Sequence, residues 1–488
     1  MFASSPAFIG LVVTYFGILV GISVWSGMKT KGLTDYLTAS RSIGPVVGGA
    51  SLAATQMSAG TFVGTLGIHY LTGASFVWLW PGLWLGWLVQ ALWVAPKFAQ
   101  FGGKTVPEYV RARYGSTAAS HIAALLILVA YTVYLTAQYQ AGGAIFQVLF
   151  GMPFLYGVLI TIGVTLLFVI VGGMRATAYT DLLDALIMAG CFLAAIPVVL
   201  MHLPADQIGG IASGFDPALT GWFYGPKDLI GFALAFGLSM ATAPYELARL
   251  YTMRDVKTVR LAIGWSFVFQ AVVGLSVAFL GVATRSVFPF LPNPDTASSV
   301  LSVEMLPPLV GGLVLIAVIG AISSTVSGIM IVSASALTHD LLGDVLRVSD
   351  RAQLWLTRLA VLALGCIPVF LALQQLDLVQ FVVLLQASLV ASFFFATVVI
   401  GLNWRGATAT GAIASMLVGF GVALGWELIG KPYEIDAVVP GVLTSVATFF
   451  VVSRLTPPPA AEHIGLFFPE QKMQARAYAT ATAPDSAG

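Results

Sequence analysis

Charge is the scarcest feature of this chain of 488 residues. Charged residues make up 9% of it, whereas soluble domains carry about 25%. Only 2 cysteines are present, which excludes a disulfide framework and a cysteine-rich metal site. The sequence contains no recognisable nucleophile–base set or phosphate-binding loop, so we do not expect an enzyme. Because 58% of the residues are hydrophobic, the chain belongs to the class of integral membrane proteins.

Apolar runs of about 20 residues recur along the chain, and this length suits a membrane-spanning helix. A membrane β-barrel would instead show shorter segments of alternating polarity. We therefore predict an all-α integral membrane protein with about 13 transmembrane helices. The expected spans lie near 7–27, 45–70, 75–97, 119–150, 154–173, 177–201, 228–248, 261–284, 307–338, 354–373, 378–401, 407–430 and 437–454.

Lysine and arginine are distributed unevenly over the loops between these spans. If the N-terminus lies outside, eighteen of the 22 basic residues fall in inside segments and three in outside loops, and Arg358 lies within a span. Membrane proteins place such basic loops in the cytoplasm. The sequence thus predicts a multi-pass protein of the cell (inner) membrane with its C-terminus in the cytoplasm. Insertion explains the basic loops, so no nucleic-acid partner is expected.

Two of the spans contain polar and small residues that would interrupt a helix. Residues 48–64, "GGASLAATQMSAGTFVG", include Gln56, Ser58 and Thr61, and residues 236–249, "FGLSMATAPYELAR", include Pro244. Each stretch alone could be a close helix contact through small residues. The two lie five spans apart, however, and paired interruptions at corresponding places indicate a transporter's binding site between two inverted repeats.

The segment "AISSTVSGIM", residues 321–330, carries four hydroxyl side chains within five positions, 323–327. A single hydroxyl in a membrane helix usually bonds a carbonyl of its own helix. This cluster instead suits a hard monovalent cation such as Na⁺, because a divalent ion would call for more carboxylates. Further oxygens could come from carbonyls freed by the break in the span near 45–70.

An aspartate lies inside the span near 177–201, within "GGMRATAYTDLLDALIM". Acids at membrane depth are costly and are candidates for a functional role. The alternative is that both aspartates lie near the cytoplasmic interface, held by Arg175. The sequence favours this alternative more for Asp184 than for Asp181. Glu246 and Arg249, three positions apart, are expected to form a structural pair.

With these motifs the chain resembles the sodium:solute symporter family over roughly residues 7–455. The resemblance is carried by "YLTASRSIG", "AATQMSAGTFVG", "GKTVPEYVRARYG", "GGMRATAYTD", "PYELARLYTMRD" and "GAISSTVSGIMIVSASALTHDLL". It implies a LeuT-like core of two inverted five-helix repeats. The domains expected on that basis are 1–44, an N-terminal helix and loop; 45–401, a core with repeats 45–201 and 228–401; 402–455, two peripheral helices; and 456–488, a disordered cytoplasmic tail.

The resemblance also implies where the ion and the solute bind. The sodium ligands would be the carbonyls of Ala54, Met57 and Ala321 and the hydroxyls of Ser324 and Thr325. Some members hold a second sodium ion, which Asp181, Ser324 and Ser327 would match here. Gly328 stands where a serine would complete that second site, so we expect one sodium ion. Family substrates contact the first break, which offers Gln56, Ser58 and Thr61.

We therefore expect a symporter that imports a small polar solute, a carboxylate or an amino acid, together with Na⁺ by alternating access. The expected partners are this solute and the lipid bilayer, with no obligatory protein partner. One alternative is a proton-coupled permease in which Asp181 titrates. Another is a membrane sensor with a transporter-like body, which the absence of a signalling domain after the last span disfavours.

Overall fold

The computed structural model describes residues 6–215, 224–346, 348–375 and 377–468. These residues form helices, and one isolated bridge pairs Ile43 with Met253. The helices are α1 (Pro6–Lys29), α2 (Leu33–Thr38), α3 (Pro45–Gln56), α4 (Leu66–Thr72), α5 (Leu79–Val89), α6 (Ala95–Phe101), α7 (Val106–Tyr114), α8 (Thr117–Phe150), α9 (Phe154–His202), α10 (Ala205–Gly214), α12 (Pro226–Thr242), α13 (Pro244–Leu250), α14 (Val256–Val287), α15 (Ala297–Val300), α16 (Pro308–Ser335), α17 (Gly343–Leu346), α18 (Asp350–Ala372), α19 (Val379–Phe394), α20 (Gly401–Asn403), α21 (Ala409–Leu428), α22 (Val438–Leu455) and α23 (Ala461–Phe467).

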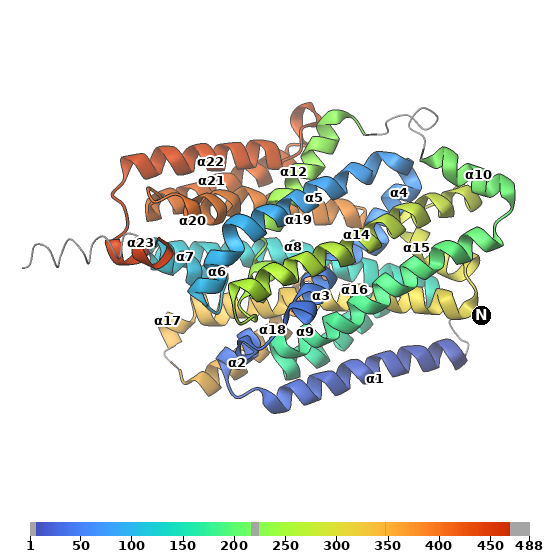
Figure 1. Cartoon of the computed structure of the whole chain (residues 1–488), viewed down its shortest axis with the longest axis horizontal. Helices are drawn as coiled ribbons and strands as arrows, with labels where there is room; N and C mark the ends of the chain where they lie inside the picture. Colours follow the sequence, from blue (N-terminus) through green and yellow to red (C-terminus); the bar gives the residue numbers. More distant parts are fainter. Residues whose placement is uncertain (1–5, 216–223, 347, 376, 469–488) are drawn as a thin grey trace, which may run out of the picture.

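The long helices lie roughly along one direction, and the short ones gather at the two ends of the bundle (Figure 1). At one end lie α2, α6, α7, α17 and α23, and at the other α4, α10 and α15. Within the described residues, eleven helices are long and apolar enough to cross a membrane. The predicted span near 45–70 is instead split into α3 and α4, and the span near 154–173 is the first part of the bent helix α9.

Helix α9 joins two predicted spans through a bend at Gly173. Gly173 has φ +59°, a backbone conformation that side chains rarely adopt, and an added Cβ would lie 2.7 Å from the carbonyl oxygen of Tyr36. The Tyr36 hydroxyl in turn donates to the carbonyl of Val169 at 3.0 Å. Glycine is therefore required where α2 closes on the bend.

The core packs in two matched sets of contacts. α3 packs on α14, just as α12 packs on α5, and α8 packs on α19, just as α9 packs on α16. Suppose that one repeat consists of α3–α4, α5, α8 and the two parts of α9, and that the other consists of α12–α13, α14, α16, α18 and α19. Each of these contacts then has its counterpart when the two repeats are exchanged. This pairing is expected of a five-plus-five inverted repeat. α21 and α22 pack on each other beside α19.

α16 is the central helix of this core. Its side chains from Val314 to Ser335 are all buried, although many of them are small or polar. A membrane helix that is buried all round is surrounded by protein rather than lipid. The hydroxyl cluster at 323–327 therefore faces other helices on every side.

The tail after residue 455 was predicted as disordered, and that prediction is wrong for residues 461–467. They form α23, which packs on α7. Phe467 is buried there, with its ring centroid 5.5 Å from that of Tyr109. The contact depends on a packing partner in α7, which the composition of the tail alone does not reveal. Residues 469–488 of the predicted tail lie outside the described residues.

Candidate functional site

The first predicted break is present in the chain after α3. The helix ends at Gln56, and Met57 takes a non-helical conformation with φ −75° and ψ 77°. The chain resumes as a π-helical segment, Gly60–Thr65, before α4. From α8, Gln138 accepts a hydrogen bond from the backbone N–H of Ala59 at 3.0 Å. A buried backbone donor released by the break is thus satisfied by a side chain, as burial requires.

The second predicted break separates α12 from α13. Ala243, with φ −56° and ψ 118°, leaves the helical conformation, and Pro244 begins the new helix. The backbone N–H of Tyr245 donates to the hydroxyl of Tyr131 at 2.7 Å. The hydroxyl of Tyr245 donates to the side-chain oxygen of Gln56. One side-chain hydrogen bond therefore joins the two breaks, which lie together in the core.

The hydroxyls of α16 reach across to the end of α3. Ser324 Oγ donates to the carbonyl of Ala54 at 2.9 Å and lies 3.0 Å from that of Ala321. Thr325 Oγ1 donates to the carbonyl of Thr55 at 2.7 Å. Of the predicted sodium ligands, the structure thus brings together Ala54, Ala321 and Ser324. It places the Thr325 hydroxyl against the carbonyl of Thr55. Met57 lies fully buried at the break itself.

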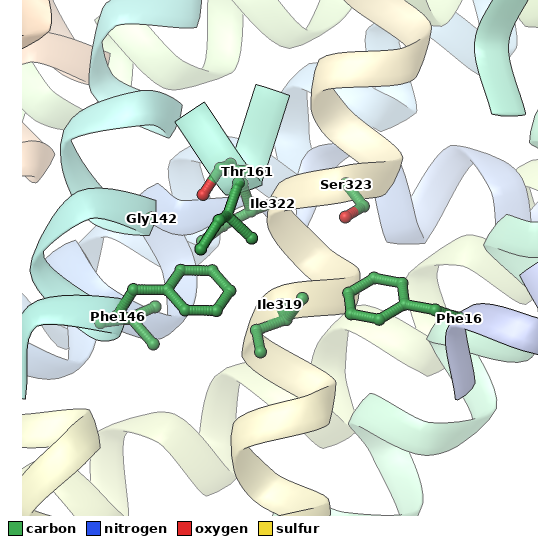
Figure 2. A pocket seen from close by; sticks show the side chains of 9 residues that line it. Phe16, Gly142, Phe146, Thr161, Ile319, Ile322 and Ser323 are labelled. Atoms are coloured by element: carbon green, nitrogen blue, oxygen red, sulfur yellow. The ribbon is translucent and has the colours of Figure 1, made fainter. Parts of the chain in front are cut away.

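Ser323 lies on a different side of α16 from this cluster. It lines a small cavity with the apolar side chains of Ile319 and Ile322 from the same helix and Phe16 from α1 (Figure 2). The cavity is only about 10 Å³ and is closed on the far side by α8 and α9 residues such as Phe146 and Thr161. Residue 323 is therefore separated from the oxygens that gather around Ser324 and Thr325.

Asp181 forms an ion pair with Arg249, which lies on α13. The guanidinium Nη2 is 3.1 Å from Asp181 Oδ2, and both side chains are buried. The same carboxylate oxygen accepts from Ser51 at 2.5 Å and lies 3.4 Å from the Thr55 hydroxyl. The expected pair of Arg249 with Glu246 is wrong, because Arg249 bonds Asp181 instead. Among the described residues, neither carboxylate oxygen of the buried Glu246 has a hydrogen-bond partner.

The expectation that Arg175 holds the two aspartates is also wrong. Asp184 is buried and accepts from the Tyr15 hydroxyl of α1 at 2.8 Å. Arg175, which was to hold the aspartates, donates instead to the carbonyl of Ala39 at 3.2 Å and to Ser40. The bend at Gly173 turns Arg175 towards the α2 loop, so it lies away from the core face of α9.

A cavity of about 20 Å³ lies beside the first break. All three predicted solute contacts, Gln56, Ser58 and Thr61, line it. The remaining lining residues are uncharged and come from several helices. They are Gly60, Thr65, Leu79, Trp80, Leu83, Tyr134, Phe236, Gln270, Gln380 and Val383. Such a volume holds about one water molecule, so a solute enters only when these helices separate.

Sequence reasoning missed the glutamines of the site. Gln270 of α14 and Gln380 of α19 line the cavity, and Gln138 of α8 holds the first break. Gln270 is buried, and its Oε1 has no hydrogen-bond partner among the described residues. Each of the three is an amide within an apolar span, a signal that could have singled them out, because buried polar groups need partners.

Comparison with known sequences places this arrangement among transporters. Residues 36–419 match the sequence model of the sodium:solute symporter family. An osmoregulated proline transporter of Bacillus subtilis (strain 168) is 29% identical over 485 residues, covering 95% of this chain and 97% of that protein. A sodium/proline symporter of Staphylococcus saprophyticus is 29% identical over 478 residues, covering 92% and 93%.

Comparison with solved structures shows the fold. A Na⁺-coupled sialic acid symporter in a substrate-bound, outward-open state gives a TM-score of 0.80 at 16% identity, covering 92% of this chain and 98% of that one. Mhp1, a nucleobase-cation symporter bound to bromovinylhydantoin, gives a TM-score of 0.58 at 14% identity, covering 90% and 98%. At such identities the likeness concerns the fold alone: an all-α membrane protein with a LeuT-like core.

Proposed function

The chain belongs to the sodium:solute symporter family, and from this premise we propose which residues hold the ion and the solute. The protein is a symporter in the cell membrane that couples Na⁺ to the import of a small solute.

The proposed sodium site consists of the carbonyls of Ala54, Met57 and Ala321 and the hydroxyls of Ser324 and Thr325. The contacts of Ser324 and Thr325 with α3 support it, since they bring neutral oxygens of both helices within hydrogen-bond distance. Neutral hydroxyls and carbonyls suit a hard monovalent ion. Because α3 and α16 belong to different repeats in the proposed division, 45–201 and 228–401, an ion between them would favour one arrangement of the two over the other.

The solute is proposed to bind beside the break of α3, against Gln56, Ser58, Thr61 and Gln270. The observation that carries this proposal is the cavity at that place, whose lining combines polar and apolar side chains and carries no charge. An uncharged lining suits a solute without net charge, and the unpartnered Oε1 of Gln270 offers an acceptor for a donor group. We propose a small amino acid such as proline, which the relatives' names support.

The end of the bundle that carries α2, α6, α7, α17 and α23 is proposed to face the cytoplasm. Basic residues concentrate in the segments that connect the spans at this end, for example Lys104, Arg111 and Arg254, and such segments stay on the cytoplasmic side. The N-terminus then lies outside.

Uptake into proteoliposomes tests the solute and the coupling together. The purified protein would be supplied with radiolabelled proline and with a panel of other amino acids, carboxylates and sugars, each with and without an inward Na⁺ gradient. We expect uptake of an amino acid that needs Na⁺ and that a proton gradient alone does not drive. Full uptake from a pH gradient in sodium-free buffer would contradict the sodium coupling and favour Asp181 as a proton carrier. Uptake of carboxylates alone would contradict the amino-acid assignment.

A further inference from the structure

The guanidinium of Arg249 is held by groups from three helical segments. Nε donates to Ser51 Oγ of α3 at 2.9 Å, and Nη1 donates to the carbonyl of Tyr245 in α13 at 2.9 Å. Nη2 bonds Asp181 of α9 at 3.1 Å. Arg249 is 1% exposed and Asp181 is fully buried. A buried charge is tolerated when it is both paired and hydrogen-bonded, and this cation meets both conditions.

Gly328 provides the space that this guanidinium fills. A Cβ added at residue 328 would lie 2.7 Å from both Nη1 and Nη2 of Arg249. A side chain at 328 and the present position of Arg249 therefore exclude each other. The family pattern has a serine at this place, as part of the second sodium site that Asp181 and Ser327 would complete.

The residues present do not fit a second ion. One carboxylate oxygen of Asp181, Oδ2, already bonds the guanidinium, whereas Oδ1 has no hydrogen-bond partner among the described residues. Ser327 donates to the carbonyl of Ser324 within its own helix, at 2.8 Å. A second sodium ion at Asp181 would bring two positive charges together in a buried place, which is costly unless further carboxylates compensate them. Displacing Arg249 instead would break its hydrogen bonds to Ser51, Tyr245 and Asp181.

We propose that Arg249 is a built-in cation that replaces a second sodium ion at Asp181, so that this chain carries a single Na⁺ per cycle. Gly328 is the residue that makes this replacement possible. The inference rests on the proposed sodium site, to which the ion pair is joined through Thr55: its hydroxyl lies 3.4 Å from Asp181, and its carbonyl accepts from Thr325. The fixed charge thus lies next to the proposed ion site.

Counting bound ions tests this inference without knowledge of the solute. Equilibrium binding of radioactive sodium to the purified full chain, at saturating Na⁺, should give one ion per protein for wild type. Asp181→Asn should still bind one ion, because its carboxylate is not a sodium ligand. The double variant Arg249→Met/Gly328→Ser frees the carboxylate and supplies the missing hydroxyl, so it should bind two. Arg254→Met removes the same charge at an exposed position and should leave the count at one.

Wild type binding two ions, with one of them lost in Asp181→Asn, would overturn the inference. A count of one in a folded Arg249→Met/Gly328→Ser variant would overturn it as well. Should the double variant fail to fold, the comparison of wild type with Asp181→Asn still decides whether a second ion binds at Asp181. The proposed sodium site fails in a different way, namely if Thr325→Ala binds Na⁺ as tightly as wild type does.

Discussion

At the scale of single residues, neighbouring hydroxyls on α16 have different surroundings. Ser324 and Thr325 bond carbonyls of α3, whereas Ser323 lines an apolar cavity beside α1. Consecutive residues of a helix point about 100° apart, so one step along the chain separates an oxygen of the proposed sodium site from one that lines an apolar cavity.

Substitutions at these positions should therefore differ in their effect on sodium. Thr325→Ala removes one buried oxygen from the proposed site and should cost about 1–3 kcal/mol, which corresponds to roughly a 5- to 150-fold weaker dependence on Na⁺. By linkage, the apparent affinity for the solute should fall at low Na⁺ and recover as Na⁺ is raised. The measurement is solute uptake against Na⁺ concentration at equal protein abundance.

Two control variants sharpen this measurement. Thr325→Ser keeps the oxygen and Ser323→Ala removes one outside the site, so both should leave the half-saturating Na⁺ concentration near the wild-type value. A larger shift in Ser323→Ala than in Thr325→Ala would show that the hydroxyls at 324 and 325 only pack the helix.

Asp295, between α14 and α16, gives a prediction about pH. Burial raises the pKa of its carboxyl from 3.8 to about 6, although the backbone N–H of Val379, 3.0 Å from Oδ2, opposes this. Because the folded protein holds this proton more tightly than the unfolded chain, stability is present below pH 4 and is lost as pH rises to about 6. Asp295→Asn should gain roughly 2–3 kcal/mol relative to wild type between pH 4 and pH 7.

Thermal unfolding of both proteins at several pH values checks this expectation. A constant difference between wild type and Asp295→Asn at all pH values would contradict the assigned pKa.

At the scale of elements, the breaks could be predicted from the sequence, but their contacts could not. Small and polar residues around Gln56 and the proline at 244 indicated where α3 and α12 end. That Tyr245 would bond Gln56, or that Arg249 would choose Asp181 over Glu246, depends on how helices far apart in the chain approach each other. Spacing within one helix suggested the wrong partner for Arg249, because the i,i+3 rule considers only one helix.

The contact between α5 and α12 gives a prediction about helix packing. The two backbones meet at glycines: a Cβ at Gly86 would lie 2.1 Å from the carbonyl oxygen of Gly237, and one at Gly237 would lie 2.5 Å from that of Gly82. Small residues allow such close approach in membranes. Gly86→Ala should therefore force the helices apart and cost about 1–3 kcal/mol.

The midpoint of thermal unfolding in detergent measures this cost. Gly190→Ala on α9 is the matched control, since an added Cβ there meets nothing within 4 Å. Equal midpoints for Gly86→Ala and Gly190→Ala would show that α5 and α12 separate without penalty.

At the scale of the whole molecule, the distribution of basic residues predicts which end faces the cytoplasm. In a variant with Cys191 and Cys366 replaced by alanine, a single cysteine is introduced at Lys257 or at Ile429. Its labelling shows which side of the membrane that end of the bundle faces. Both positions are exposed. A membrane-impermeant thiol reagent should label Ile429→Cys in intact cells, and Lys257→Cys only after permeabilisation. The reverse pattern would contradict the proposed orientation.

The neutrality of the Asp181–Arg249 pair has an electrical consequence. If these two charges cancel each other and the solute carries no net charge, each inward passage moves one elementary charge, that of the sodium ion. A membrane potential of 100 mV supplies about 2.3 kcal/mol for one such charge, which by itself supports roughly a 50-fold accumulation of solute. The cell's voltage would thus contribute to uptake even where sodium concentrations on the two sides are equal.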